Sequence, residues 1–276
     1  MRSACHKRHW RLPAAVALVV TLAMPAGARE IKVCADPNNM PFSNERREGF
    51  ENRIVEVIAR DLGAAVSYVW WAQRRGFIRN TLTSGVCDLV PGIPSALEML
   101  STTAPYYRSS YVFVTRSDGP DIRSFADPRL ATLRVGVQLI GDDGVNSPPV
   151  QALARRGIVG NLQGFPVYGD YSRDNPAAPI IEAVAGGAVD VAVVWGPLAG
   201  YFAGRQKASL RLTPVSPLVD TPLQPMVYDI SMGVRREDSA LRDEVDAALV
   251  RNQAEIDAIL TAYGVPRLDR PEDAGQ

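Results

Sequence analysis

Strand patterns that alternate with helix patterns constrain this chain more than any other feature. Apolar residues of the first helix pattern, including Phe50, Ile54 and Ile58, recur at helical spacing after a short apolar strand. The first series comprises strands at 31–35, 66–70 and 87–90 and helices at 50–62 and about 76–84. Such alternation favours parallel sheets covered by helices. The first third of the chain therefore predicts one α/β unit.

A second series of the same kind follows a polar stretch near residues 118–128. It comprises strands at 134–137, 164–168 and 190–195 and helices opened by Pro148 and Pro179. A proline-rich return then leads to a strand at 226–234 and a long helical tail. We predict two α/β lobes around a cleft, joined by two crossings near residues 115–120 and 224–229. The first lobe comprises 29–117 and 226–276, and the second comprises 118–225.

The N-terminus has the pattern of a secretory signal peptide. Four basic residues precede or open a 13-residue apolar run, residues 12–24, and small residues at 26–28 follow it. A membrane anchor is disfavoured because roughly 20 apolar residues are needed to cross a bilayer. We expect cleavage after Ala28, release into the periplasm and no membrane anchor.

Cleavage changes the composition of the mature chain in one informative way. Lys and Arg fall from 30 to 26 against 30 acidic residues, so nothing favours nucleic acid as a partner. Both histidines, His6 and His9, lie in the removed segment. The mature chain then has no imidazole general base, no histidine-activated nucleophile and no histidine metal ligand. Most hydrolase and metalloenzyme functions are disfavoured.

Two cysteines, Cys34 and Cys87, remain after cleavage. In an oxidising compartment an even pair indicates a disulfide, and a loop of this length gives at most about 4 kcal/mol in the chain-entropy model. Both lie in predicted strands, where bridges between neighbours are geometrically awkward, so two buried thiols are the alternative.

The order of several segments resembles the type II periplasmic solute-binding family throughout the mature chain. These segments are PF (41–42), GFE (49–51), SGVCDLVPG (84–92), TTAPYYRS (102–109), RVGVQLIGDDG (134–144) and AVAGGAVDVAVV (183–194). The resemblance implies two α/β lobes, with ligand contacts from strand ends and helix N-termini at the cleft.

Longer motifs resemble a narrower group, the quinoprotein dehydrogenase-associated J proteins of methanol-oxidation gene clusters. The motifs are NNMPFSN (38–44), QRRGFIRNTL (73–82), PYYRSSYVF (105–113), GVQLIGDDGVNSPP (136–149), ALARRGIVGN (152–161), VVWGPLAGYF (193–202) and DISMGVRR (229–236). This resemblance implies a periplasmic accessory protein that binds, or assists the maturation of, a methanol or alcohol dehydrogenase carrying pyrroloquinoline quinone (PQQ). The quinone then belongs to the partner, and we expect this chain to bind no cofactor.

The anchors by which amino-acid receptors of this fold commonly hold a zwitterion are missing from the expected places. The stretch 92–107 contains no arginine that could pair with a carboxylate, and the strand at 190–195 runs directly into Gly196 and Pro197 without an acid. A conventional amino-acid receptor is therefore disfavoured.

Aromatic residues at strand ends and loops replace these anchors, and aromatic side chains are favoured at protein interfaces. The expected cleft residues are Phe42, Trp70, Trp71, Tyr106, Tyr107 and Trp195, with Arg74 and Arg108 as candidates for pairing with a partner's carboxylates. For Trp70 and Tyr106 a place in the lobe core is an equal alternative, whereas exposed arginines are usually solvated or in weak surface pairs.

Gln138 is the ninth expected cleft residue, since Gln138 and the following GDDG segment lie where the second lobe is expected to present backbone N–H groups at a helix start. Asp142 and Asp143 oppose an anion there, which favours a turn. With Asn146 they could suggest calcium, but the spacing of a calcium loop is absent, so we expect no metal site.

Three functions remain open from the sequence. The first is the accessory function, with the aromatic cleft as a docking surface. The second is delivery of a small, non-zwitterionic ligand to an ABC transporter. The third is a fold-sharing enzyme such as a dehydratase or lytic transglycosylase, for which Glu51, Asp36 and Glu98 are the only candidate acids. We expect Glu51 to serve the helix dipole instead, and we expect no enzyme activity.

Overall fold

The computed structural model describes residues 29–268 apart from residues 96, 141–145, 169 and 222–223. The expected signal peptide, residues 1–28, therefore lies outside the described residues. Asp142 and Asp143, at which the sequence disfavours a calcium site, also lie outside the described residues.

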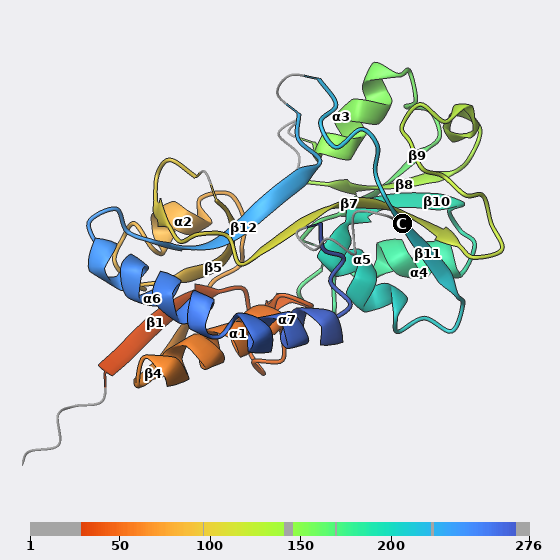
Figure 1. Cartoon of the computed structure of the whole chain (residues 1–276). Helices are drawn as coiled ribbons and strands as arrows, with labels where there is room; N and C mark the ends of the chain where they lie inside the picture. The colour runs from red at the N-terminus through yellow and green to blue at the C-terminus, as the bar shows by residue number, and fades with distance from the viewer. Residues whose placement is uncertain (1–28, 96, 141–145, 169, 222–223, 269–276) are drawn as a thin grey trace, which may run out of the picture.

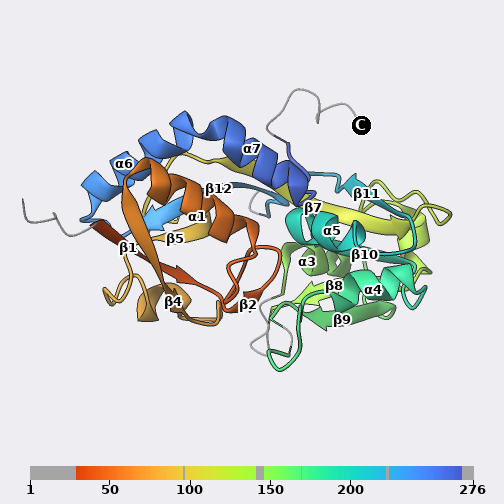
Figure 2. The same cartoon turned by 90° about the horizontal axis from the view of Figure 1, so that it is seen from below.

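The described chain forms two α/β lobes, as the sequence predicts (Figure 1). The elements of the first lobe that precede the crossing are β1 (Arg29–Ala35), β2 (Asn38–Asn39), β3 (Ser43–Asn44), α1 (Phe50–Asp61), β4 (Ala64–Trp70), α2 (Phe77–Asn80), β5 (Val90–Pro94) and β6 (Ser101–Thr102). After the return strand β12 (Val227–Val234), helices α6 (Ser239–Arg251) and α7 (Gln253–Ala262) complete it. Figure 2 shows α1, α6 and α7 together in this lobe.

The second lobe follows the long strand β7 (Tyr107–Arg116). Its elements are the 3-10 helix η1 (Pro128–Ala131), β8 (Val135–Leu139), α3 (Pro148–Arg155), β9 (Leu162–Pro166), α4 (Pro179–Ala185), β10 (Val191–Trp195), α5 (Gly196–Ala203) and β11 (Leu210–Pro214). Strands β9, β8 and β10 are parallel neighbours, as the second alternating series predicts.

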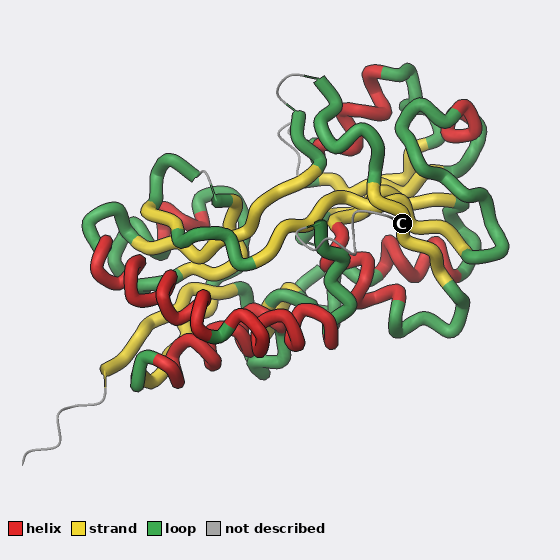
Figure 3. Tube along the Cα trace, in the orientation of Figure 1, coloured by secondary structure: helices red, strands yellow, loops and turns green. Residues whose placement is uncertain are grey.

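Strands β7 and β12 carry the main sheet from one lobe to the other. This sheet has the order β5-β12-β7-β10-β8-β9. Residues 107–110 of β7 pair antiparallel with β12, and residues 111–115 pair antiparallel with β10. Figure 3 shows both strands passing between the lobes without a break. The predicted lobe boundaries at 117/118 and 225/226 stay a prediction.

Helix α1 shows why the alternating pattern is informative. Phe50, Ile54 and Ile58 fall on one face and are at most 1% exposed, since this face packs toward β4, α6 and α7. Gly63, with φ +61°, follows the helix in the left-handed conformation that glycine adopts readily.

Two predicted elements of the first lobe are wrong in detail. The helix expected over about 76–84 is limited to α2, Phe77–Asn80, because turns begin at Thr81, whose hydroxyl donates to the carbonyl of Phe77. The strand expected at 87–90 begins only at Val90 and pairs antiparallel with β12. Just before β5, Leu89 forms an isolated parallel bridge with Val33, and the backbone of residues 88–89 hydrogen-bonds to β1.

The expected disulfide is present. Cys34 of β1 and Cys87, just before β5, are bonded with their Cα atoms 5.7 Å apart, and both are fully buried. Cys87 lies outside the regular strand, so the geometric difficulty of bridging adjacent strands does not arise.

Candidate functional site

A cavity of about 480 Å³ is lined by residues of both lobes, and we call it the inter-lobe cavity. Its lining residues are Asn39, Phe42, Gln73, Gly92, Pro94, Tyr107, Tyr111, Gln138, Ile140, Ser147, Pro148, Val167, Tyr168, Trp195, Leu198, Tyr228 and Ile230. Within the described part of the chain, none of these side chains carries a formal charge. The volume is in the range of small-molecule sites, and the wall is mainly apolar and aromatic.

Strand register brings the largest rings of the cavity together. Trp195 of β10 lies opposite Tyr111 of β7, and Ile230 of β12 lies opposite Tyr107 of β7. Residues directly opposite each other share a face of the sheet, and Tyr228 shares that of Ile230 because it is two residues away. The ring of Trp195 meets the rings of Tyr111 and Tyr228 edge to face, with centroids 5.5 and 5.8 Å apart.

The second lobe supplies its part of the wall from the carboxyl ends of parallel strands. Gln138 and Ile140 lie at the end of β8, Val167 and Tyr168 follow β9, and Trp195 ends β10. Open α/β sheets place their binding crevices at such strand ends. Chain order and sheet topology together therefore position this side of the cavity.

The polar side chains of the cavity wall bond mainly to the wall itself. Gln138 accepts the backbone N–H of Trp195 at 3.1 Å, and the hydroxyl of Ser147 donates to the carbonyl of Gln138 at 2.7 Å. The amide of Asn39 donates to the side chain of Gln73 at 3.2 Å. These bonds hold the wall together and leave the aromatic surface as its main contact area.

Glu51 lies behind the first-lobe side of the cavity and is 7% exposed. Its backbone N–H donates to the carbonyl of Phe42 at 3.0 Å, and a Cβ added to Gly92 would overlap its carboxyl group. Burial, together with the charge of Asp36, raises the pKa of Glu51 to about 8. Position 92 therefore accepts only glycine as long as the carboxyl group of Glu51 occupies its present position.

Asp36, at the end of β1, connects the two lobes. Its carboxylate accepts the backbone N–H of Asn38 at 2.8 Å, that of Gln73 at 2.6 Å and the hydroxyl of Tyr171 at 2.5 Å. Asn38 also donates to the carbonyl of Arg173 at 2.9 Å. We call the contacts of Asp36 and Asn38 with residues 171–173 the lobe latch.

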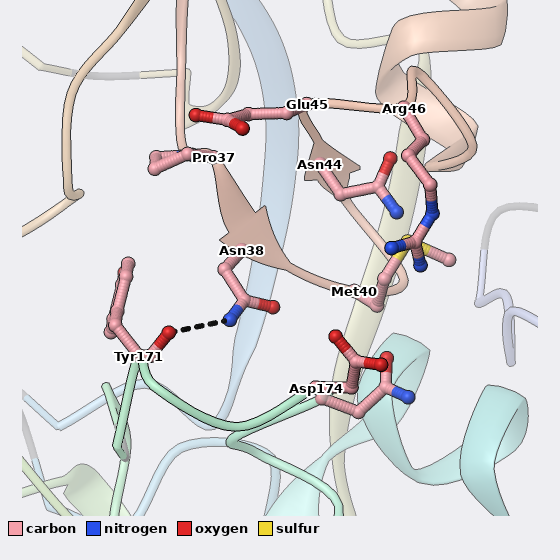
Figure 4. A pocket seen from close by; sticks show the side chains of 9 residues that line it. Pro37, Asn38, Met40, Asn44, Glu45, Arg46, Tyr171 and Asp174 are labelled. Carbon is pink, nitrogen blue, oxygen red and sulfur yellow. Dashed lines mark hydrogen bonds between the residues drawn. The ribbon is translucent and has the colours of Figure 1, made fainter.

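A second, more polar pocket of about 310 Å³ lies at the lobe latch. Figure 4 shows Asn38 directed toward the carbonyl of Tyr171, at 3.5 Å, with Glu45, Arg46 and Asp174 around the opening. Charged groups of both signs surround it, so it lacks the apolar wall of the inter-lobe cavity.

Four of the nine residues expected at the cleft line the inter-lobe cavity. They are Phe42, Tyr107, Gln138 and Trp195. They come from the loop after β2 and from β7, β8 and β10, so the fold brings together residues far apart in the sequence. Their function in binding stays a prediction.

The other five expected cleft residues are not among the lining residues. Tyr106 lies in the first-lobe core and is 2% exposed. The ring of Trp70 stacks on the ring of Tyr68, which lies on the same face of β4, with the ring centroids 4.5 Å apart. Trp71 is 47% exposed. The two arginines have partners elsewhere: Arg74 lies over the ring of Tyr171, and Arg108 pairs with Asp229 across β7 and β12 at 3.0 Å.

Tyr111 and Tyr228 are the cavity residues that the sequence reasoning missed. Period-two alternation in β7 places Tyr111 four residues beyond Tyr107 and so on the same side, which is a usable signal. Tyr228 requires the pairing of β7 with β12, and no local pattern in the sequence supplies that register.

The fold and the cleft define the chain as a type II periplasmic binding protein. Residues 31–265 match the model of the bacterial extracellular solute-binding proteins, family 3, and the chain belongs to this family.

Relatives within this family share most of the chain. Protein MoxJ of Methylorubrum extorquens is 34% identical over 87% of this chain and 82% of its own length. Protein MoxJ of Paracoccus denitrificans is 31% identical over 91% of this chain and 95% of its own length. The crystal structure of the periplasmic binding protein XoxJ from Methylobacterium extorquens AM1 has a TM-score of 0.71 and 33% identity, covering 87% of this chain and all of that chain. The predicted resemblance to the J-protein group is confirmed.

Two features are absent from the described residues. No helix there is both long and apolar enough to cross a bilayer. No cluster of three or more cysteine, aspartate or glutamate side chains there is arranged to hold a metal ion.

Proposed function

We propose that this chain is a non-enzymatic periplasmic accessory protein of a PQQ-dependent methanol or alcohol dehydrogenase. It binds the dehydrogenase or assists its maturation, with the inter-lobe cavity receiving apolar side chains of the partner. The quinone is carried by the dehydrogenase, and this chain holds none. Export by the N-terminal segment brings this chain into the periplasm, the compartment in which it meets the dehydrogenase.

The observation that carries this proposal is an aromatic cavity without a zwitterion clamp. Among the described residues that line the cavity, no arginine is available for a carboxylate and no acid for an amine. Arg108 is paired with Asp229 instead. Rings such as those of Trp195 and Tyr228 offer large contact area at low entropic cost, as protein interfaces use them.

Similarity to the J proteins supports the choice of partner. It extends over most of this chain and most of each relative, so the whole two-lobed molecule is shared. A mature chain without histidine also lacks the usual general base of hydrolases. Glu51 is buried behind Gly92 and Phe42, a position from which a general acid has poor access to substrate.

The alternative function is that of a solute-binding receptor of an ABC transporter for a small, non-zwitterionic ligand. Membership of the extracellular solute-binding family and the cavity volume favour it. A receptor gives a single-site calorimetric isotherm with a small molecule when no partner protein is present.

Complementation of a deletion strain tests the accessory function. Loss of the gene is expected to lower the periplasmic quinoprotein dehydrogenase activity, and the wild-type chain restores it. Trp195→Ala, which removes a ring from the cavity, is expected to restore little activity, whereas Trp71→Ala, outside the cavity, restores it fully. Unchanged dehydrogenase activity in the deletion strain would rule the proposal out.

A further inference from the structure

We propose that a pocket beside β7 and β11, separate from the inter-lobe cavity, binds a phosphate group through Arg123, Arg211 and Ser110. We call it the arginine pocket. Its volume is about 320 Å³, and its lining residues are Ser110, Arg123, Arg211, Leu212, Thr213, Pro214, Pro266, Arg267 and Leu268. The proposal concerns a second site and goes beyond the accessory function.

The arginine pocket and the inter-lobe cavity share no lining residue. Ser110 precedes Tyr111 in β7, so its side chain lies on the opposite face of the strand from the tyrosine that lines the cavity. Residues 266–268, which follow α7, reach β7 at this point, because the hydroxyl of Ser109 donates to the carbonyl of Pro266 at 2.6 Å. A ligand here therefore contacts elements of the second lobe and the end of the first lobe without entering the cleft.

The first support is the charge of the wall. Arg123, Arg211 and Arg267 are among the described lining residues, whereas no aspartate or glutamate is. Arg267 is 8% exposed and forms an ion pair with Asp257, which holds its guanidinium in place. Guanidinium groups suit phosphate recognition because their donors form a planar fork that matches two oxygens at once. The wall is therefore suited to an anion.

The second support is the free bonding capacity of two of these arginines. Arg211 donates from Nη2 to the carbonyl of Ser117 at 2.8 Å, and within the described residues no acid pairs with it and its buried Nη1 has no partner. Arg123 pairs with Asp121 through Nε at 2.8 Å, and its terminal nitrogens bond to no described residue. Buried polar groups normally have partners, so the charge of Arg211 indicates room for an anion.

The third support is the hydroxyl of Ser110. Ser110 is only 2% exposed and lines the arginine pocket, yet no described residue forms a hydrogen bond with its hydroxyl. A serine hydroxyl can donate to an anionic oxygen, and such a bond is stronger than one between neutral groups. Ser110 therefore supplies a neutral donor beside the cationic ones.

The distribution of donors favours phosphate over carboxylate. They come from β7, from the loop that holds Arg123, from β11 and from the segment after α7. A single guanidinium fork satisfies the two oxygens of a carboxylate, whereas a phosphate group offers more acceptor oxygens and up to two negative charges. The pocket volume also leaves room for the organic part of a small phosphate monoester. Free phosphate and a monoester thus share the chemistry that the site recognises.

Calorimetry on the isolated mature protein tests the proposal with inorganic phosphate, glycerol 1-phosphate and acetate as probes. All titrations are made at one ionic strength, because salt screens such interactions. We expect single-site binding of at least one phosphate probe, and at least tenfold weaker binding of acetate. The tighter of the two phosphate probes identifies free phosphate or a monoester as the ligand. Acetate binding as tight as phosphate, or no saturable binding of either phosphate probe, would overturn the proposal.

Variants of the wall locate the bound group. Arg211→Gln and Ser110→Ala are each expected to weaken phosphate binding at least tenfold. Arg123→Gln, whose side chain is 71% exposed and so tolerates replacement, is expected to weaken it about threefold. Arg134→Gln is the matched control, since Arg134 is an exposed arginine of the same lobe that pairs with Asp190 outside the pocket.

Arg134→Gln should bind phosphate like the wild-type chain. Binding that is indifferent to both Arg211→Gln and Arg123→Gln, or weakened as much by Arg134→Gln, would show that phosphate does not bind in the arginine pocket. Because no dehydrogenase is present and the inter-lobe cavity is untouched, failure here leaves the accessory function standing.

Discussion

Glu51 shows how one buried acid acquires unusual properties from its surroundings. Residue 51 lies in the first turn of α1, where a carboxylate is favoured by the helix dipole, yet burial beside Asp36 opposes ionisation. Burial prevails, and the pKa of Glu51 is raised to about 8. The sequence predicts the helix-dipole position of this acid but not its burial.

Glu51→Gln is expected to remove one component of the pH dependence of stability. Between about pH 4.5 and pH 8 the folded chain holds a proton on Glu51 that the unfolded chain releases. The free energy of unfolding therefore falls as pH rises through this range and levels off above it. The wild-type chain should lose roughly 3 to 5 kcal/mol more than the variant between pH 4.5 and pH 9. Urea unfolding at both pH values measures this difference.

Glu56→Gln, on the same helix but partly exposed and paired with Arg53, controls for the change in net charge. It should show the same pH dependence as the wild-type chain. Parallel curves for the wild-type chain and Glu51→Gln would show that Glu51 ionises normally.

The predictability of the site differs from residue to residue. Trp195 and Gln138 follow from local pattern, because each lies at the end of a buried parallel strand and such ends meet at the cleft. Tyr228 depends on the register between β7 and β12, which are separated by the whole second lobe. For Tyr106 and Trp70 the sequence leaves core and cleft as alternatives, because a local pattern does not distinguish a face that packs in the core from one that lines the cleft.

At the scale of elements, the disulfide secures the N-terminal strand of the first lobe. Strand β1 pairs with β4, and Cys34 bonds it to the segment that leads into β5. The sequence predicted this bond but placed Cys87 in a parallel strand. The regular strand β5 begins only at Val90 and pairs antiparallel with the return strand β12, and the parallel pairing with β1 is limited to the bridge between Val33 and Leu89.

Replacing both cysteines by alanine is expected to lower the free energy of unfolding by about 2 to 4 kcal/mol, because the bond closes a loop of 53 residues in the unfolded chain. Denaturant unfolding of the double variant measures the loss. Both side chains are fully buried, so reduced wild-type protein serves as the control for lost packing volume. Equal stability of the oxidised and reduced wild-type protein would contradict the expectation.

At the scale of the whole molecule, the lobe latch joins the two lobes beside the cavity. The hydroxyl of Tyr171 donates to a carboxylate of Asp36 that is 2% exposed, and such charge-assisted bonds contribute about 1.5 to 3 kcal/mol. Tyr171→Phe is therefore expected to shift the population toward a more open arrangement by roughly tenfold or more. Small-angle scattering should show a larger radius of gyration than that of the wild-type chain.

Ser172→Ala is the matched control for this measurement. The hydroxyl of Ser172 bonds to Asp170 within the same loop and does not reach the first lobe. Its scattering curve should equal that of the wild-type chain. If Tyr171→Phe also leaves the curve unchanged, the latch does not hold the lobes together.

The accessory function itself is tested most directly by calorimetric titration of the mature chain with its cognate quinoprotein dehydrogenase. We expect saturable binding, weakened about 30-fold or more by Trp195→Ala, since buried aromatic anchors commonly contribute at least 2 kcal/mol at interfaces. Trp71→Ala should bind like the wild-type chain. Absence of binding, or binding that is indifferent to Trp195, would contradict the assignment of the inter-lobe cavity as the docking site.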